Sequence, residues 1–200
     1  MTDVAGAVDA IRAGGLAIVP TDTVYGLATS PHAETYARRL YRAKGRDELQ
    51  PTALVAADLD VLLELVPELN GRAALIARTL LPGPYTLVLP NPGRRFGWLT
   101  GARPDTIGVR VPAATGPAAA ILAGVGAMVA TSANLPGGPD PRTLADVPGE
   151  LREAADAVVD GGELPGAPST VIDWTGEEPV VVREGAAHST EAIRAVASVL

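Results

Sequence analysis

Helical stretches and short apolar runs alternate along the whole of this 200-residue chain. In residues 4–13, apolar side chains recur at helical spacing, whereas the apolar run at 16–19 is too short for a helix and ends at a proline. This alternation continues to the last residues. It is typical of α/β proteins, in which helices pack on a partly parallel sheet. The sequence therefore predicts α/β layers.

The pattern predicts particular helices and strands. The predicted helices comprise residues 4–13, 33–43, 59–65, 70–81, 117–122 and 190–199. The predicted strands comprise residues 16–19, 52–56, 85–89, 107–111, 127–131, 157–159, 170–173 and 180–183. No linker, composition break or repeat divides the chain, which indicates one domain over residues 1–200. Two long loops rich in Gly and Pro, 91–104 and 135–141, are expected to border a site.

Composition excludes several functional classes. A formal charge of −7 argues against binding nucleic acids by bulk neutralisation of phosphates. The absence of cysteine excludes disulfides, thiolate metal sites and a Cys nucleophile, and the two histidines lie too far apart for a zinc motif. No apolar run reaches membrane-spanning length, and the first residues do not resemble a signal peptide. A cytoplasmic protein without membrane contact is expected.

Familiar catalytic motifs are also missing. The chain has no Walker A sequence, no G-x-G-x-x-G after a strand and no G-x-S-x-G elbow. Any catalysis is therefore expected to rest on the positioning of substrates and on charge rather than on a nucleophilic triad.

Lys44 is the only lysine in a chain with fifteen arginines. A compact ammonium in place of a guanidinium suits contact with phosphate oxygens. A solvated cation that ends a helix ahead of Gly45 would give the same local sequence. Position alone does not separate these interpretations.

Polar side chains also gather where predicted strands end, which is where α/β sheets place ligands. Residues 20–26 follow the first strand, and residues 131–134 follow another. Arg110 and Arg183 close two further strands, and Ser169 precedes one. Taken singly, such hydroxyls are usually turn or capping residues, and such arginines usually form surface ion pairs.

The order of these clusters resembles the YrdC family of threonylcarbamoyl-adenylate synthases. The resemblance covers roughly residues 5–185 and rests on seven motifs: residues 20–26, Lys44-Gly45-Arg46, and residues 82–86, 110–112, 132–134, 169–171 and 183–185. It implies a single-domain, twisted mixed sheet with flanking helices around a deep groove. The chain looks like the short form without the extra C-terminal domain of some relatives.

The resemblance also implies a nucleotidyltransferase reaction. L-threonine, bicarbonate and ATP would give threonylcarbamoyl-AMP and pyrophosphate, for the biosynthesis of threonylcarbamoyladenosine (t6A) in tRNA. Mg²⁺ would accompany ATP without a metal site formed by the protein. Downstream tRNA-modifying proteins would accept the intermediate, and contact with tRNA itself would be weak.

Site residues follow from the same resemblance. The residues expected to hold ATP are Lys44, Arg46, Gln50, Thr106, Ser132, Asn134 and Arg183. Lys44 and Arg46 would act catalytically, by stabilising charge on the departing pyrophosphate. The residues expected to hold threonine are Thr23, Arg110, the backbone near Ala130, and Ser169, with Arg110 facing the carboxylate.

The chain departs from the family pattern at three positions. Asp47 stands where proline is common, Val55 where some members have histidine, and Asp140 where Ser or Thr is frequent. An unpaired carboxylate at position 140 would repel a triphosphate. We expect Asp140 to turn toward Arg142 and solvent rather than to bind Mg²⁺.

Two other functions use the same fold. One is a non-catalytic RNA-binding or regulatory protein, which the acidic balance disfavours because phosphate contacts need local cations. The other is carbamoyl transfer, as in hydrogenase maturation, a route that normally uses additional domains.

Overall fold

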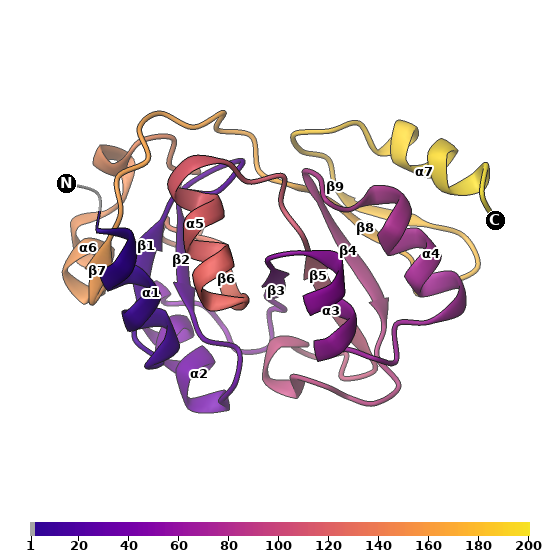
Figure 1. Ribbon diagram of the computed structural model, residues 1–200, viewed down its shortest axis with the longest axis horizontal. Helices are drawn as coiled ribbons and strands as arrows, with labels where there is room; N and C mark the ends of the chain where they lie inside the picture. Colours follow the sequence, from indigo (N-terminus) through magenta and orange to yellow (C-terminus); the bar gives the residue numbers. More distant parts are fainter. Residues whose placement is uncertain (1–2) are drawn as a thin grey trace.

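A nine-stranded sheet runs through the molecule in the computed structural model, which describes residues 3–200 (Figure 1). Its strands, in spatial order, are β7 (Ala157–Val158), β1 (Ala17–Val19), β2 (Gly26–Thr29), β6 (Ala127–Ser132), β3 (Ala53–Ala56), β5 (Thr106–Arg110), β4 (Tyr85–Pro90), β8 (Thr170–Asp173) and β9 (Val180–Arg183). Three neighbouring pairs are parallel (β1/β7, β3/β5 and β4/β8) and the other five are antiparallel. The predicted mixed α/β sheet is confirmed.

Seven α-helices flank this sheet in the described part of the chain. They are α1 (Val4–Arg12), α2 (Glu34–Lys44), α3 (Leu59–Leu65), α4 (Gly71–Leu80), α5 (Gly116–Val125), α6 (Gly149–Ala154) and α7 (Ser189–Ala197). Two short 3₁₀ helices cover Gly97–Leu99 and Leu144–Asp146. In Figure 1, α1 and α7 lie at opposite ends of the molecule.

Every helix and strand predicted from the sequence is present, with ends shifted by a few residues. The sequence pattern missed α6 and β2. Strand β2 lies between β1 and β6 and pairs antiparallel with both. Its four residues carry no alternating pattern, because both faces of the strand are buried.

The central strands divide their side chains between two faces. Large apolar side chains on one face join the main core with residues of α3, α4 and α7; among them are Leu54, Leu87, Leu89, Ile107, Val109, Val129 and Ile172. Small or polar side chains alternate with them, including Ala53, Thr86, Thr106, Gly108, Arg110, Ala130 and Ser132. Since successive strand residues point to opposite faces, these strands have one face in the core and one free to line a cavity.

Helices α1 and α5 cover only one end of that second face. Ile11 of α1 and Ile121 of α5 pack in a separate cluster with Val19, Ala28 and Met128. The part over β3, β5, β4 and β8 is not covered in this way, and a cavity lies there.

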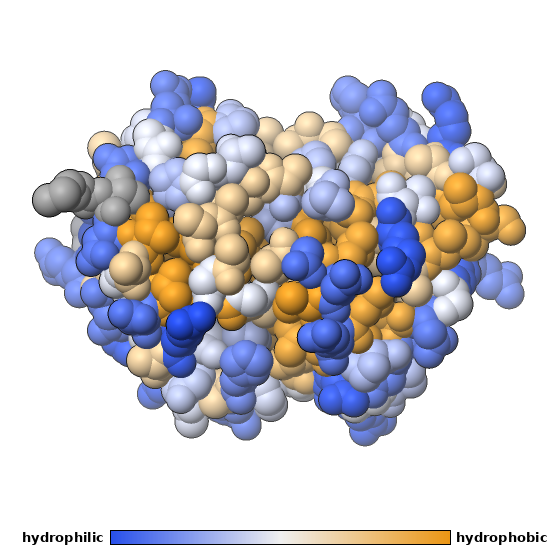
Figure 2. All heavy atoms as spheres, viewed as in Figure 1, coloured by the Kyte–Doolittle hydropathy of each residue, from blue (hydrophilic) through white to orange (hydrophobic). Residues whose placement is uncertain are grey.

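On the face that Figure 2 shows, hydrophilic and hydrophobic residues are interspersed, and hydrophobic residues also show near the end of α7. At this end Val199 is 47% exposed and Leu200 is 61% exposed. No helix within residues 3–200 combines the length and hydropathy needed to cross a bilayer.

Candidate active site

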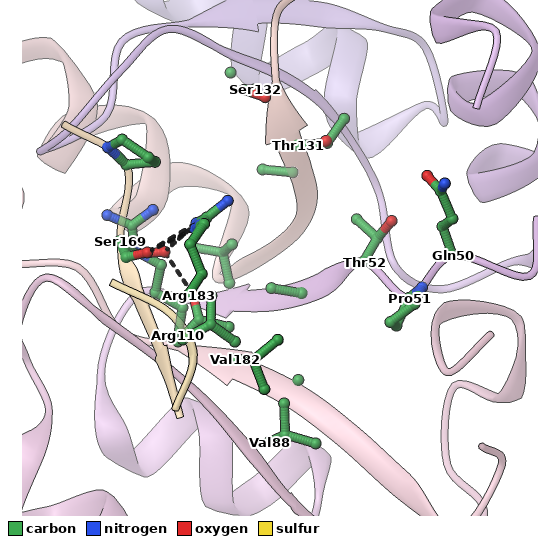
Figure 3. Close-up of a pocket in the computed structure, with 18 of the residues that line it drawn as sticks. Gln50, Pro51, Thr52, Val88, Arg110, Thr131, Ser132, Ser169, Val182 and Arg183 are labelled. Carbon is green, nitrogen blue, oxygen red and sulfur yellow. Dashed lines mark hydrogen bonds between the residues drawn. The ribbon is translucent and has the colours of Figure 1, made fainter. Parts of the chain in front are cut away.

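The cavity over the open sheet face has a volume of about 680 Å³. Its walls come from the turn after β1, the segment 46–53, the inner faces of the central strands, and the ends of β8 and β9. Figure 3 shows Ser132 and Thr131 at one end, Val88 at the other, and Arg183 pointing into the space between them. Segments far apart in the chain therefore meet around one volume.

Nine of the eleven predicted site residues line this cavity: Thr23, Arg46, Gln50, Thr106, Arg110, Ala130, Ser132, Ser169 and Arg183. The other two, Lys44 and Asn134, do not line it. They lie behind Ser132 and are hydrogen-bonded to it.

Lys44 is the last residue of α2, which Gly45 ends in the left-handed conformation (φ 66°). The predicted helix-end geometry is therefore present, but Lys44 is only 4% exposed and is not a solvated cation. Its Nζ donates to the Ser132 carbonyl, to Asn134 Oδ1 (2.7 Å) and to Ser132 Oγ (3.4 Å). Burial and the charge of Arg46 lower the pKa of Lys44 to about 8, against a smaller opposite effect of Asp140.

Arg46 follows one residue after Gly45 and reaches the cavity. Its Nη2 donates to the Pro51 carbonyl (2.7 Å) and its Nη1 to Thr131 Oγ1 (3.4 Å). Its Nε is buried without a partner among the described residues. Burial lowers the pKa of Arg46, but an arginine at this position stays charged. The positive charge of Arg46 is therefore present at the cavity wall.

Arg110 ends β5 and forms a buried ion pair with Asp22, through Nη2. The same nitrogen donates to Thr23 Oγ1 (3.0 Å), and Nε has no partner in the described structure. Burial raises the pKa of the Asp22 carboxyl, although the nearby guanidinium acts in the opposite direction. The sequence analysis did not single out Asp22, whose only signal was its place between two threonines of the 20–26 motif.

Arg183 closes the opposite side from β9. Its Nη2 donates to the Ser169 carbonyl (2.8 Å) and to Ser169 Oγ (3.3 Å), contacts drawn in Figure 3. Ser169 Oγ also shares a hydrogen bond with Thr86 Oγ1 (2.8 Å). Thr86 was part of the quoted 82–86 motif but not a predicted site residue.

The remaining predicted residues offer neutral groups. Thr106 Oγ1 donates to the Arg103 carbonyl (3.0 Å), Gln50 is exposed, and Ala130 pairs with strands on both sides. Next to them Asp173 lines the cavity and pairs with Arg103 (2.6 Å). These two charged residues were not predicted, although Arg103 lies in the loop 91–104 that was expected to border a site.

Asp140 was expected from the sequence to turn toward Arg142, and this expected partner is wrong. Arg142 pairs with Glu163 (2.8 Å) instead, and Asp140 accepts a hydrogen bond from Asn134 Nδ2 (3.4 Å). Asn134 therefore connects the carboxylate of Asp140 to the ammonium of Lys44. Lys44 provides the nearby positive charge that draws Asp140 inward.

The sequence of this chain matches a protein-family model over most of its length. The Sua5/YciO/YrdC model, described as "Telomere recombination", matches residues 9–185. The chain belongs to the Sua5/YciO/YrdC family. The motif-based resemblance to YrdC proteins is confirmed.

Individual relatives agree with this assignment. A protein named threonylcarbamoyl-AMP synthase from Pyrococcus abyssi is 36% identical over 88% of this chain, and the chain spans 52% of that relative's length. A protein with the same name from Halorhodospira halophila is 37% identical over 76% of this chain and 78% of its own. The structure of P. abyssi Sua5 complexed with L-threonine is 34% identical, with a TM-score of 0.86 over 96% of this chain and 56% of that one. Thus the chain spans little more than half of the P. abyssi proteins it matches.

Proposed function

We propose that this Sua5/YciO/YrdC protein is a nucleotidyltransferase that makes threonylcarbamoyl-AMP and pyrophosphate from L-threonine, bicarbonate and ATP. The relatives named for this activity support the proposal. The observation that carries it is the arrangement of arginines around one cavity: Arg46, Arg183 and Arg110 approach from three separate segments. In two of them, Arg46 and Arg110, the buried Nε has no partner in the described structure. The three positive charges suit anionic substrates.

ATP is assigned to the part of the cavity formed by Arg46, Ser132, Thr106, Gln50 and Arg183. Arg46, which lines the cavity, would offer its positive charge to the phosphates. Ser132 Oγ and Thr106 Oγ1 offer hydroxyls without adding charge. The positive charge of Lys44 lies behind Ser132, and Asn134 fixes its position.

L-threonine is assigned to the neighbouring part, against Thr23, Ser169 and the Ala130 backbone. Arg110 would bind its carboxylate through the donors that Asp22 leaves free. The complex of P. abyssi Sua5 with L-threonine supports a threonine site in this family.

The chemistry needs no protein nucleophile. The amine of threonine and bicarbonate first form a carbamate, with a new N–C bond and loss of water. A carbamate oxygen then attacks the α-phosphorus, the new O–P bond forms, and the bond to the β-phosphate oxygen breaks to release pyrophosphate. Holding both reactants in line contributes on the order of 7–11 kcal/mol in favourable cases. Arg46 and Arg183 would stabilise charge on the departing group.

Mg²⁺ is proposed to enter with ATP, held by phosphates and water. Within residues 3–200 no cluster of three or more His, Cys, Asp or Glu side chains could hold a metal ion. The cavity carboxylate, Asp173, is already bonded to Arg103 and Thr175. This donor set suits Mg²⁺ bound mainly by its substrate. The ion would offset charge on the phosphates.

The product would pass to tRNA-modifying proteins of t6A biosynthesis, with weak contact between this protein and tRNA itself. The supply of ATP and tRNA points to the cytoplasm.

An RNA-binding protein without activity is the alternative. The local arginines favour it, but they gather around one cavity of about 680 Å³ rather than along an extended basic surface.

Pyrophosphate release tests the proposal. Purified protein with ATP, Mg²⁺, L-threonine and bicarbonate is expected to release pyrophosphate without tRNA, and omission of threonine should abolish release. Arg46→Ala should abolish it, while Arg194→Ala, which changes an exposed arginine on α7, should not. Folded protein that binds ATP without turnover would refute the synthase and favour the RNA-binding alternative.

A further inference from the structure

Asp22 is charged and buried, yet the proposed reaction gives it no role. Its side chain is 10% exposed and does not line the cavity, whereas the adjoining Thr21 and Thr23 do. Thr21 Oγ1 fixes the turn around it, by accepting from the Thr23 and Val24 amides (3.1 and 3.2 Å) and donating to the Val24 carbonyl (2.7 Å). The turn thus holds the carboxylate in one place behind the cavity wall.

The ion pair joins parts of the wall that the sheet does not connect directly. Asp22 precedes β2, Arg110 ends β5, and β6 and β3 lie between these strands. Three strand spacings amount to about 14 Å along a flat sheet. β2 and β5 run in the same direction, so the start of β2 and the end of β5 lie toward opposite ends of their strands. The turn and the Arg110 side chain therefore meet over the open face of the sheet, and the pair fixes the guanidinium relative to the turn.

Asp22 also determines which donors of Arg110 remain available. Both hydrogen bonds that Arg110 makes among the described residues leave from Nη2, to Asp22 and to Thr23. Nε is buried without a partner. The protein thus occupies Nη2, and Nη1, which makes no hydrogen bond among the described residues, is left for a ligand oxygen.

A second consequence concerns charge. Without Asp22, Arg110 would attract phosphate groups as well as carboxylates, since a guanidinium binds both in the same geometry. The proposed reaction requires a triphosphate in the same cavity. By Coulomb's law a carboxylate repels a dianionic phosphate about twice as strongly as it repels a monoanionic carboxylate at equal distance. Asp22 therefore disfavours phosphate at Arg110 more than it disfavours an amino acid.

We infer that Asp22 is a positioning and selectivity residue: it orients Arg110 toward a substrate carboxylate and keeps phosphate out of the amino-acid end of the cavity. This inference rests on the proposed function for the identity of the amino acid. Selection between carboxylate and phosphate depends only on the geometry around Arg110.

Asp22→Asn tests the role of the charge, because it keeps the shape and an acceptor oxygen. Calorimetry on the whole protein would measure the dissociation constants of L-threonine and of inorganic phosphate, the latter in competition with threonine. In the variant, the preference for threonine over phosphate is expected to fall at least tenfold. ATP affinity should change less than twofold. In turnover, KM for threonine should rise while kcat changes less than threefold.

Asp22→Glu is the matched control, since it keeps the charge on a longer side chain. It should weaken the binding of L-threonine, because the longer side chain displaces Arg110, and it should still exclude phosphate. Should Asp22→Asn fold poorly, thermal shift still reads the effect: phosphate is expected to raise its unfolding midpoint more than that of the wild type. The inference would be overturned if the preference of Asp22→Asn for threonine over phosphate stayed within twofold of the wild-type preference. Absence of turnover in the wild type would refute the proposed reaction instead, and leave the phosphate measurement interpretable.

Discussion

Replacing Lys44 by Met is expected to remove a pH dependence from the stability of the folded protein. The ammonium that this change deletes is 4% exposed and has its pKa lowered from 10.5 to about 8, first by burial and then by Arg46. Met has a similar length and no charge. The variant therefore tests the burial of the charge with little change in packing.

The size and sign of the effect follow from the two pKa values. Between pH 8 and 10.5 the unfolded chain, with a Lys44 pKa near 10.5, binds more protons than the folded one. Wild-type stability therefore gains a contribution that rises with pH through this window. From pH 7 to 10 the gain is about 2–3 kcal/mol, and Lys44→Met lacks it.

Urea unfolding of both proteins at pH 7, 8, 9 and 10 measures this difference. Tyrosines and other groups that titrate in this range are common to both proteins and cancel in the difference. Arg194→Met, at an exposed position on α7, serves as control and should follow the wild type. Curves for wild type and Lys44→Met that stay parallel over the whole range would refute a buried, perturbed ammonium.

Nucleotide binding gives a second measurement of the same residue. At pH 9 only about one-eleventh of Lys44 would be protonated in the free protein, so ATP should bind about tenfold more weakly than at pH 7 if the charge is required. Lys44→Met should bind ATP weakly at both values. A wild-type affinity that is independent of pH would separate Lys44 from the phosphates.

Three further changes have defined outcomes. Arg110→Ala should weaken L-threonine more than ATP in calorimetry, and the opposite order would reverse the assignment of the two ends of the cavity. Gly185→Ala would place a Cβ 2.2 Å from the Pro168 carbonyl oxygen. It should lower the free energy of unfolding by about 1–3 kcal/mol. The control variant Gly149→Ala, which has open space around its Cβ, should not lower it. Gly45→Ala meets no atom within 4 Å but must adopt a φ of 66°, so a loss of about 1–2 kcal/mol is expected in denaturant unfolding, and an unchanged midpoint would contradict the left-handed cap.

The sequence predicted much of the fold because local pattern and tertiary role agree in most elements. In β5, for example, Ile107 and Val109 alternate with smaller or polar residues, and the alternation corresponds to the two faces of the sheet. Strand β2 was missed because its pairing with β1 and β6, rather than its own residues, makes it a strand. Helix α6 has only six residues, too few for a clear helical period.

The motif order placed nine of eleven predicted residues on one cavity, but it did not give their contacts. Lys44 occupies a typical helix end, and its burial depends on the turn at Ser132, 88 residues away. The pairing of Asp22 with Arg110 likewise depends on how the turn before β2 approaches the end of β5, with two strands between them. Such contacts are set by the three-dimensional path of the chain, which local sequence does not record.

Strand β9 sits at the edge of the sheet with Val180 60% exposed and Val182 62% exposed, and it pairs only with β8. Little apolar area opposes its separation from the sheet, so its amides should be among the first to exchange with solvent. Arg183 would leave the cavity with it, since its contacts to Ser169 depend on this strand. Suppose that β9 is paired with β8 in only a fraction f of molecules. The dissociation constant of a ligand that requires Arg183 is then larger by a factor of 1/f. Nucleotide binding would then stabilise the paired state of β9, and a more stably paired β9 would strengthen nucleotide binding. The affinity for nucleotide therefore reports the local stability of β9.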